Sequence, residues 1–226
     1  MIFDFNGVLV DDEHVHFMLF RDVLAEEGIE LTEAQYHERY LGFDDRGCFE
    51  TALGEAGQDA SRDRVDSLIA RKAARYVDVA ETGLRFFPSA ADSLSALATR
   101  WPLAICSGAL RPEIEFALAR MQLRPQVLEI ISAEDTQRCK PDPEGYLLTL
   151  AVLRVHPTSN LADLDPSECL VIEDSLAGVV SAKAAGMQAV AVTHTYTVAE
   201  LEEAGADVVV PGLVTLTPEW VEARFA

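Results

Sequence analysis

Four positions along the chain carry side chains that could do chemistry, and each comes after a short apolar run. In chain order they are Asp4, Ser107, Lys140 and the adjacent pair Glu173-Asp174. Carboxylates can act as nucleophiles or as ligands of hard cations, and a lysine can balance their charge. Each group alone also fits an ordinary role: a turn aspartate, a capping serine, a solvated lysine or a helix N-cap. Their joint order therefore carries the argument.

Short apolar runs alternate with helical patterns through most of the chain, which indicates a parallel sheet covered by helices on both faces. The predicted strands are Met1–Phe5, Pro102–Cys106, Glu129–Ile131, Cys169–Ile172, Ala189–Val192 and Asp207–Val210. Because parallel strands end at one edge of a sheet, we expect the four groups to converge on one pocket. A nucleophile, a hydroxyl, a cation and metal ligands together are the equipment for phosphoryl transfer through an aspartyl-phosphate.

One segment breaks the alternation, because residues 14–82 show helical patterns without an intervening strand. We therefore expect an α/β core formed by residues 1–13 and 83–226, with a small helical insert at 14–82 placed after the first strand.

The charge composition limits the classes of partner that the chain can bind. The 226 residues include 38 acidic and 18 basic side chains, for a net charge of −20. Such a chain repels nucleic acid and anionic lipid, so we expect neither as a partner. The four cysteines form no CxxC pair, and the chain shows no signal segment or membrane span, which favours a cytoplasmic protein. The oligomeric state is not readable, and a monomer is compatible with the sequence.

These residues resemble the haloacid dehalogenase superfamily over essentially the whole chain. The similarity is greatest to the branch that contains β-phosphoglucomutase and phosphoglycolate-type sugar phosphatases. Its most specific piece is the segment Val171–Met187, beside Asp4–Val8 and Lys140–Pro143. The resemblance implies a Rossmann-like core, with the helical insert serving as the family's mobile cap.

The resemblance also implies a role for each matching residue. Asp4 would be the nucleophile, and Mg²⁺ would be the cofactor. The implied metal ligands are Asp4, the backbone carbonyl of Asn6 and Asp174, with Glu173 nearby or also ligating. Ser107, Gly108 and Lys140 would hold the transferring phosphoryl group. In the cap, Arg46 of the segment Gly42–Arg46 would meet the substrate phosphate. His16, with Glu13, matches a Glu-x-x-His that often begins the cap, and as a substrate-binding residue it would orient the hinge or the leaving group.

One position departs from the family pattern, because Asn6 stands where the phosphatases and mutases carry a second aspartate. That aspartate works as general acid and base, help worth about 10²–10⁴ in rate. The chain could be a slow phosphatase that uses Asp11, Asp12 or His16 instead, a variant that traps the aspartyl-phosphate, or a binding protein without turnover.

We expect a Mg²⁺-dependent phosphatase that acts on a small phosphorylated metabolite, of the sugar phosphate or phosphoglycolate type. The alternatives are a β-phosphoglucomutase-like isomerase and a catalytically weak protein that binds a phosphorylated ligand. A dehalogenase is disfavoured, because Lys140 and the Glu173-Asp174 pair are residues of the types that bind phosphate and a metal ion.

Overall fold

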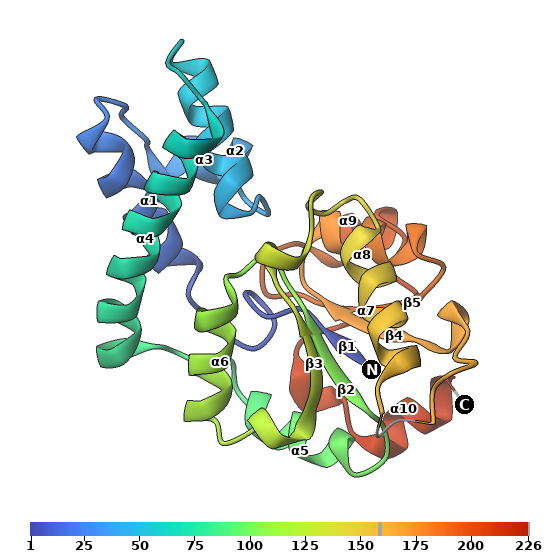
Figure 1. Cartoon of the computed structure of the whole chain (residues 1–226). Coiled ribbons are helices and arrows are strands. Elements are labelled where there is room, and N and C mark those ends of the chain that lie inside the picture. The colour runs from blue at the N-terminus through green and yellow to red at the C-terminus, as the bar shows by residue number, and fades with distance from the viewer. Residues whose placement is uncertain (158–159, 226) are drawn as a thin grey trace. The chain divides into compact units, whose positions relative to one another are not determined.

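The computed structural model describes residues 1–157 and 160–225, so positions 158, 159 and 226 of the expected core range lie outside the described residues. The chain divides into two compact units (Figure 1). The sheet unit comprises Met1–Asp11 and Phe86–Ala226, and the helical unit comprises Asp12–Arg85.

The sheet unit is built on six strands in the order β3-β2-β1-β4-β5-β6, all paired in parallel. The strands are β1 (Ile2–Phe3), β2 (Leu103–Cys106), β3 (Val127–Ile131), β4 (Leu170–Glu173), β5 (Gln188–Val192) and β6 (Val208–Val210). The strand order reverses between β1 and β4, which opens a crevice at their carboxyl ends where such sheets bind ligands. The expected fold class, a Rossmann-like parallel α/β core with a helical insert after the first strand, is confirmed.

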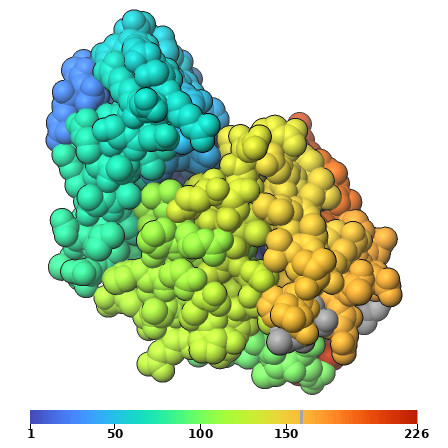
Figure 2. Space-filling view, in the orientation of Figure 1, coloured from blue at the N-terminus to red at the C-terminus, as the bar shows by residue number. Residues whose placement is uncertain are grey.

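Helices cover this sheet, and in Figure 2 side chains from the green, yellow and orange parts of the sheet unit cover the face turned to the viewer. The helices are α5 (Ala90–Ala98), α6 (Arg111–Arg120), α7 (Glu144–Val155), α8 (Leu176–Ala184), α9 (Val198–Glu203) and α10 (Pro218–Phe225). Short 3-10 turns lie at η1 (Arg124–Gln126), η2 (Ala133–Asp135), η3 (Pro166–Glu168) and η4 (Leu213–Thr215).

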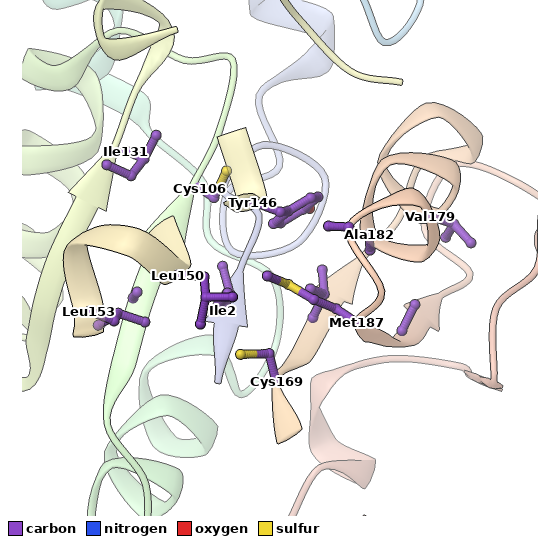
Figure 3. Close-up of a cluster of buried hydrophobic side chains, with 14 of the residues drawn as sticks. Ile2, Cys106, Ile131, Tyr146, Leu150, Leu153, Cys169, Val179, Ala182 and Met187 are labelled. Atoms are coloured by element: carbon purple, nitrogen blue, oxygen red, sulfur yellow. The ribbon is translucent and has the colours of Figure 1, made fainter. Parts of the chain in front are cut away.

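The central strands β1, β2 and β4 are buried on both faces. Ile2 pairs in register with Ala104 and Val171, and all three belong to the apolar cluster under α7 and α8. Figure 3 shows this cluster, with Leu150 of α7 and Val179 of α8 among its members. The next residue along each of these strands is fully buried too: Phe3, Ile105 and Ile172. Because both faces of these strands are apolar, polar chemistry is left to the residues at and beyond the strand ends.

The helical unit has its own apolar core. Its helices are α1 (Glu13–Glu26), α2 (Glu33–Arg39), α3 (Asp45–Glu55) and α4 (Arg62–Gly83). Phe20, Phe49 and Leu68 lie in this core, and the side chains of Thr32 and Asp44 cap the amino ends of α2 and α3. Among residues 1–157 and 160–225, no helix combines the length and apolar character that a bilayer crossing requires.

Candidate active site

Asp4 is the first residue beyond β1, which ends two residues earlier than expected. Its backbone N–H donates to the carbonyl of Ile172 in β4 at 2.9 Å, so the loop stays joined to the neighbouring strand. Glu173 is the last residue of β4, and Asp174 follows it. Asp4, Glu173 and Asp174 are buried, and each offers an oxygen within 4.8 Å of the others. The parallel topology thus gathers acidic groups that are far apart in the sequence.

Lys140 supplies positive charge to this cluster from the segment between β3 and α7. Its Nζ donates to Asp4 Oδ1 at 2.8 Å and also to Glu173 Oε1. The side chain of Lys140 is 17% exposed, so the pair with Asp4 is shielded from bulk water. An ammonium in this position can balance a carboxylate nucleophile and a phosphoryl group at once.

Both oxygens of Glu173 already have partners. Oε1 accepts from the Lys140 ammonium and, at 2.8 Å, from the Tyr146 hydroxyl. Oε2 accepts from the backbone N–H groups of Asp174 and Ser175 at 3.0 and 3.1 Å, and from Ser175 Oγ at 3.0 Å. A carboxylate has about four acceptor positions, so the five donors saturate Glu173. In this geometry Glu173 holds Lys140 and the start of α8.

The loop after β1 is tight and packs directly against Asp174. Gly7 donates its N–H to the Val10 carbonyl at 2.9 Å, and the Phe5 carbonyl accepts from the Val10 N–H at 3.2 Å. Gly7 has a φ of +73°, and a Cβ there would lie 2.1 Å from Asp174 Oδ2. Only glycine fits, because a side chain would occupy the place of that carboxylate. Asn6 lies in the same loop, half-buried and bridged to Val10.

The charges in the cluster act strongly on one another. Burial raises the pKa of Asp4 to about 6, since the Lys140 ammonium offsets only part of the cost of an ionised buried carboxylate. Burial, with the charges of Glu173 and Asp4, raises the pKa of Asp174 well above its usual range. Burial also opposes ionisation of Glu173, but Lys140 and the hydrogen bonds outweigh it, and its pKa is lowered. Burial opposes the charge of Lys140 as well, but Asp4 and Glu173 hold its pKa well above its usual range.

A divalent cation fits this donor set. Three carboxylates face one ammonium at this edge of the sheet, so the cluster carries more negative than positive groups. Burial first, and neighbouring carboxylates second, raise the pKa values of Asp4 and Asp174, and a bound cation would offset this cost of ionising them. Carboxylate and carbonyl oxygens are the ligands that hard divalent cations prefer. The acidic cluster could therefore bind a divalent metal.

Ser107 and Gly108 follow β2, the other neighbour of β1. The backbone N–H of Ser107 donates to the Ile131 carbonyl at 3.0 Å, and Ser107 Oγ accepts from the Ala109 N–H at 3.3 Å. Within the described part of the chain, no acceptor is found for the Ser107 hydroxyl hydrogen. This hydroxyl is placed to donate to a ligand at the same edge of the sheet.

The cap residues singled out from the sequence have partners inside the helical unit. His16 lies with Nδ1 2.8 Å from Lys72 Nζ and Nε2 3.3 Å from an oxygen of Asp12. Asp12 also accepts from the Tyr76 hydroxyl at 2.5 Å. His16 and Asp12 are two of the three residues expected as substitute bases. Both ring nitrogens of His16 and the carboxylate of Asp12 already have partners in the helical unit.

Arg46 is engaged on the surface of the helical unit. Its guanidinium pairs with Asp66 and lies 3.8 Å from a Glu50 carboxylate oxygen. The preceding residue, Asp45, lies in the interior of the helical unit. Its Oδ1 accepts from Lys72 at 2.5 Å, while its Oδ2 is buried with no hydrogen-bond partner among residues 1–157 and 160–225. The buried pair of Asp45 and Lys72 was not expected from the sequence.

Other residues that the sequence analysis did not single out also touch the site. Tyr146 and Gly178 contact Glu173, the Thr195 hydroxyl donates to Asp174 Oδ2, and His194 Nδ1 lies 2.7 Å from the Gly7 carbonyl oxygen. Of these, Gly178 alone had a sequence signal, because it lies inside the specific segment Val171–Met187.

The chain is similar in sequence and fold to known hydrolases. The sequence profile of haloacid dehalogenase-like hydrolases matches residues 1–192. Protein CbbY of Rhodobacter capsulatus is 30% identical over 207 residues, which are 87% of this chain and 86% of that protein. A phosphorylated carbohydrates phosphatase of Thermotoga maritima is 30% identical over 189 residues, 83% of this chain and 82% of that protein. The crystal structure of a hydrolase from Pseudomonas syringae, 22% identical, matches the fold with a TM-score of 0.82 over 100% of this chain and 98% of that one.

Proposed function

Because the chain belongs to the haloacid dehalogenase-like hydrolase family, we propose that it is a phosphatase that hydrolyses a small phosphate monoester through a phosphorylated Asp4. The observation that carries the proposal is the contact between Lys140 Nζ and Asp4 Oδ1 at 2.8 Å, beside two further buried carboxylates. Relatives whose names describe phosphatases of phosphorylated carbohydrates and hexitols support the enzyme class and a sugar phosphate or a similar metabolite as substrate.

The proposed reaction has two steps. An oxygen of the Asp4 carboxylate attacks phosphorus, the P–O bond to the alcohol breaks, and the alcohol oxygen keeps the electron pair and takes up a proton from water. Water then attacks the phosphorus of the acyl phosphate, and the P–O bond to Asp4 breaks with its electron pair left on the Asp4 carboxylate. The attacking water gives up a proton to solvent, and inorganic phosphate is released. Lys140 pairs with a phosphoryl oxygen in both steps, and the Ser107 hydroxyl donates to another.

Asp4, Asp174 and the Asn6 carbonyl would hold Mg²⁺, whose charge offsets the negative charge that the phosphoryl oxygens gain. Glu173 takes part through Lys140, because its own oxygens accept from Lys140, Tyr146 and the start of α8. The helical unit is proposed as the family's cap, which would exclude water during transfer. The four cysteines are free thiols, which suits a reducing compartment, and a cytoplasmic location is part of the same proposal.

Turnover should be slow for poor leaving groups. Asn6 stands in the loop beside Asp4, and an amide side chain cannot exchange a proton near neutral pH as a carboxylate does. This residue also favours a second candidate, a protein that binds a phosphorylated ligand without turning it over. A β-phosphoglucomutase-like isomerase needs proton transfer by a general acid–base in both half-reactions, so the amide of Asn6 disfavours this alternative most.

Turnover of p-nitrophenyl phosphate with Mg²⁺, and its loss with EDTA or in Asp4→Ala, tests the proposal. Stabilisation of the fold by a phosphorylated metabolite, without any turnover, would favour the binding protein instead. A panel of phosphorylated carbohydrates, tested for phosphate release, would then identify the substrate.

A further inference from the structure

The two residues His194 and Thr195, beyond the end of β5, each contact a different part of the active site. The Thr195 hydroxyl donates to Asp174 Oδ2, and His194 Nδ1 lies 2.7 Å from the carbonyl oxygen of Gly7. Asp174 follows β4, the direct neighbour of β5, and Gly7 belongs to the loop after β1, one strand further. One short segment therefore contacts both elements that would hold the cation.

Thr195 fixes one side of the Asp174 carboxylate. Oδ2 lies against the backbone of Gly7, where a Cβ would be 2.1 Å away, and accepts from the Thr195 hydroxyl. In the described part of the chain, no hydrogen bond is found to Oδ1 of Asp174. One oxygen is thus held while the other stays available, which is how a ligating carboxylate is oriented by its neighbours in metal sites.

His194 fixes the loop that carries Asn6. A carbonyl oxygen can only accept, so the 2.7 Å contact with Gly7 requires the proton of the imidazole on Nδ1. The ring stacks on Phe87 with centroids 3.8 Å apart and planes within 8°. The Phe87 N–H donates in turn to the Leu9 carbonyl at 3.0 Å, so the same loop is held at two points.

We propose that Thr195 and His194 are positioning residues for the cation, Thr195 through the Asp174 carboxylate and His194 through the Gly7 carbonyl and the adjoining Asn6 peptide. This inference rests on the proposed function. It assigns a role to the segment after β5, which the sequence motifs did not include. Neither residue would touch the phosphoryl group, because both act through the groups that would hold the metal.

The test is the affinity for Mg²⁺, measured by titration calorimetry on Thr195→Val and Thr195→Ser. Valine keeps the shape and removes the hydroxyl, and we expect Mg²⁺ affinity to fall by about 10–100-fold, as for other residues that orient metal ligands. Serine keeps the hydroxyl and should bind Mg²⁺ like the wild type. In Thr195→Val, the rate on p-nitrophenyl phosphate should recover when the Mg²⁺ concentration is raised.

Thr197→Val is the matched control. Its hydroxyl accepts from the Glu200 N–H at 3.4 Å and caps α9, so its loss should lower the melting temperature without changing Mg²⁺ affinity. A Thr195→Val protein that behaves in the same way, less stable but with unchanged Mg²⁺ affinity, would overturn the proposal for Thr195.

A second pair of variants keeps the inference testable if Thr195→Val does not fold. His194→Phe keeps the stack on Phe87 and removes the N–H, whereas His194→Asn keeps a donor near the position of Nδ1. We expect weaker Mg²⁺ binding for phenylalanine than for asparagine, and equal binding by both variants and the wild type would overturn the role of His194. If the wild type binds no Mg²⁺, the proposed function fails as well. If the wild type binds Mg²⁺ and the substitutions at His194 and Thr195 leave its Mg²⁺ affinity unchanged, the inference alone fails.

Discussion

Gly178 lies so close to Glu173 that a Cβ atom at position 178 would be 1.8 Å from Glu173 Oε1. The first turn of α8 therefore leaves space for the carboxylate that holds Lys140. We expect Gly178→Ala to displace Glu173, to lower the free energy of unfolding by about 1–3 kcal/mol or more, and to abolish phosphatase activity. Chemical denaturation and an aryl phosphate assay check both effects.

Gly54→Ala is the control, because a Cβ on this exposed residue of α3 would meet nothing within 4 Å. Alanine there should stabilise the helix by about 0.5–1 kcal/mol and leave activity unchanged. A Gly178→Ala protein as stable and active as the wild type would contradict the packing between α8 and Glu173.

Lys140→Met should be costly for stability and for catalysis. The substitution leaves the buried carboxylates of Asp4 and Glu173 without their ammonium, and loss of one partner of a buried pair costs about 3–5 kcal/mol. We expect kcat on an aryl phosphate to fall by about 10²–10³, as when one stabilising group is removed from a transition state.

Lys183→Met is the matched surface change, because Lys183 pairs with Asp207 where both side chains are about one-third exposed. Its effect on stability should stay within about 1 kcal/mol. Equal losses for the two lysine variants would argue against a special role for Lys140.

The metal-free protein should become less stable, through Asp4, as the pH rises from about 4 to about 6. The folded pKa of Asp4 is about 6 against an ordinary 3.8, so its contribution to stability is fully present below the ordinary value and is lost as the pH rises through the folded value. Urea unfolding in EDTA at several pH values, on the wild type and on Asp4→Asn, isolates this contribution as the difference between the two proteins.

Mg²⁺ binding should show the opposite pH dependence, because a cation binds ionised carboxylates. We expect Mg²⁺ affinity to fall as the pH drops below about 6, the folded pKa of Asp4. A pH-independent affinity would mean that Asp4 is not a ligand.

Asn6→Asp should raise turnover on alkyl phosphate esters by about 10²–10⁴, since an aspartate can protonate the leaving oxygen and activate water. The gain on aryl or acyl phosphates should be smaller if phosphorylation of Asp4 limits their rate, and comparable if dephosphorylation does. Mass spectrometry of the Asn6 peptide must accompany the assay, because Asn6-Gly7 is a sequence prone to deamidation. No gain, with ordinary rates on sugar phosphates in the parent protein, would mean that another group supplies the proton.

Arg46→Ala should raise KM for the substrate by about 10–100-fold if this arginine meets the substrate phosphate, because a charged hydrogen bond is worth about 1.5–3 kcal/mol. Mg²⁺ affinity should not change. Asp66→Ala is the informative companion, because it removes the carboxylate that pairs with Arg46 and, among the described residues, should leave the guanidinium with only its longer contact to Glu50 at 3.8 Å. Unaltered kinetics in Arg46→Ala would leave Arg46 as a surface charge of the helical unit.

The sequence alone determined the fold class and the identity of the groups at the sheet edge. The apolar runs that form the central strands leave polar side chains to the residues at and beyond their ends, so Asp4, Ser107 and Asp174 could be assigned to one edge of the sheet from the sequence. The helical insert was equally readable, because no apolar strand interrupts residues 14–82.

Only the tertiary structure decided how these groups are held. In the sequence, nothing distinguishes Tyr146 from other aromatic residues of a helix, or Thr195 from other threonines of a loop. In the structure their hydroxyls donate to Glu173 and Asp174, respectively. Arg46 pairs with Asp66, twenty residues away in the chain. Such partners depend on the packing of helices and strands from distant parts of the sequence, and side-chain pairing of this kind leaves no periodicity or spacing in the chain. Strand ends could be predicted because the topology of a parallel sheet brings them together whatever the packing.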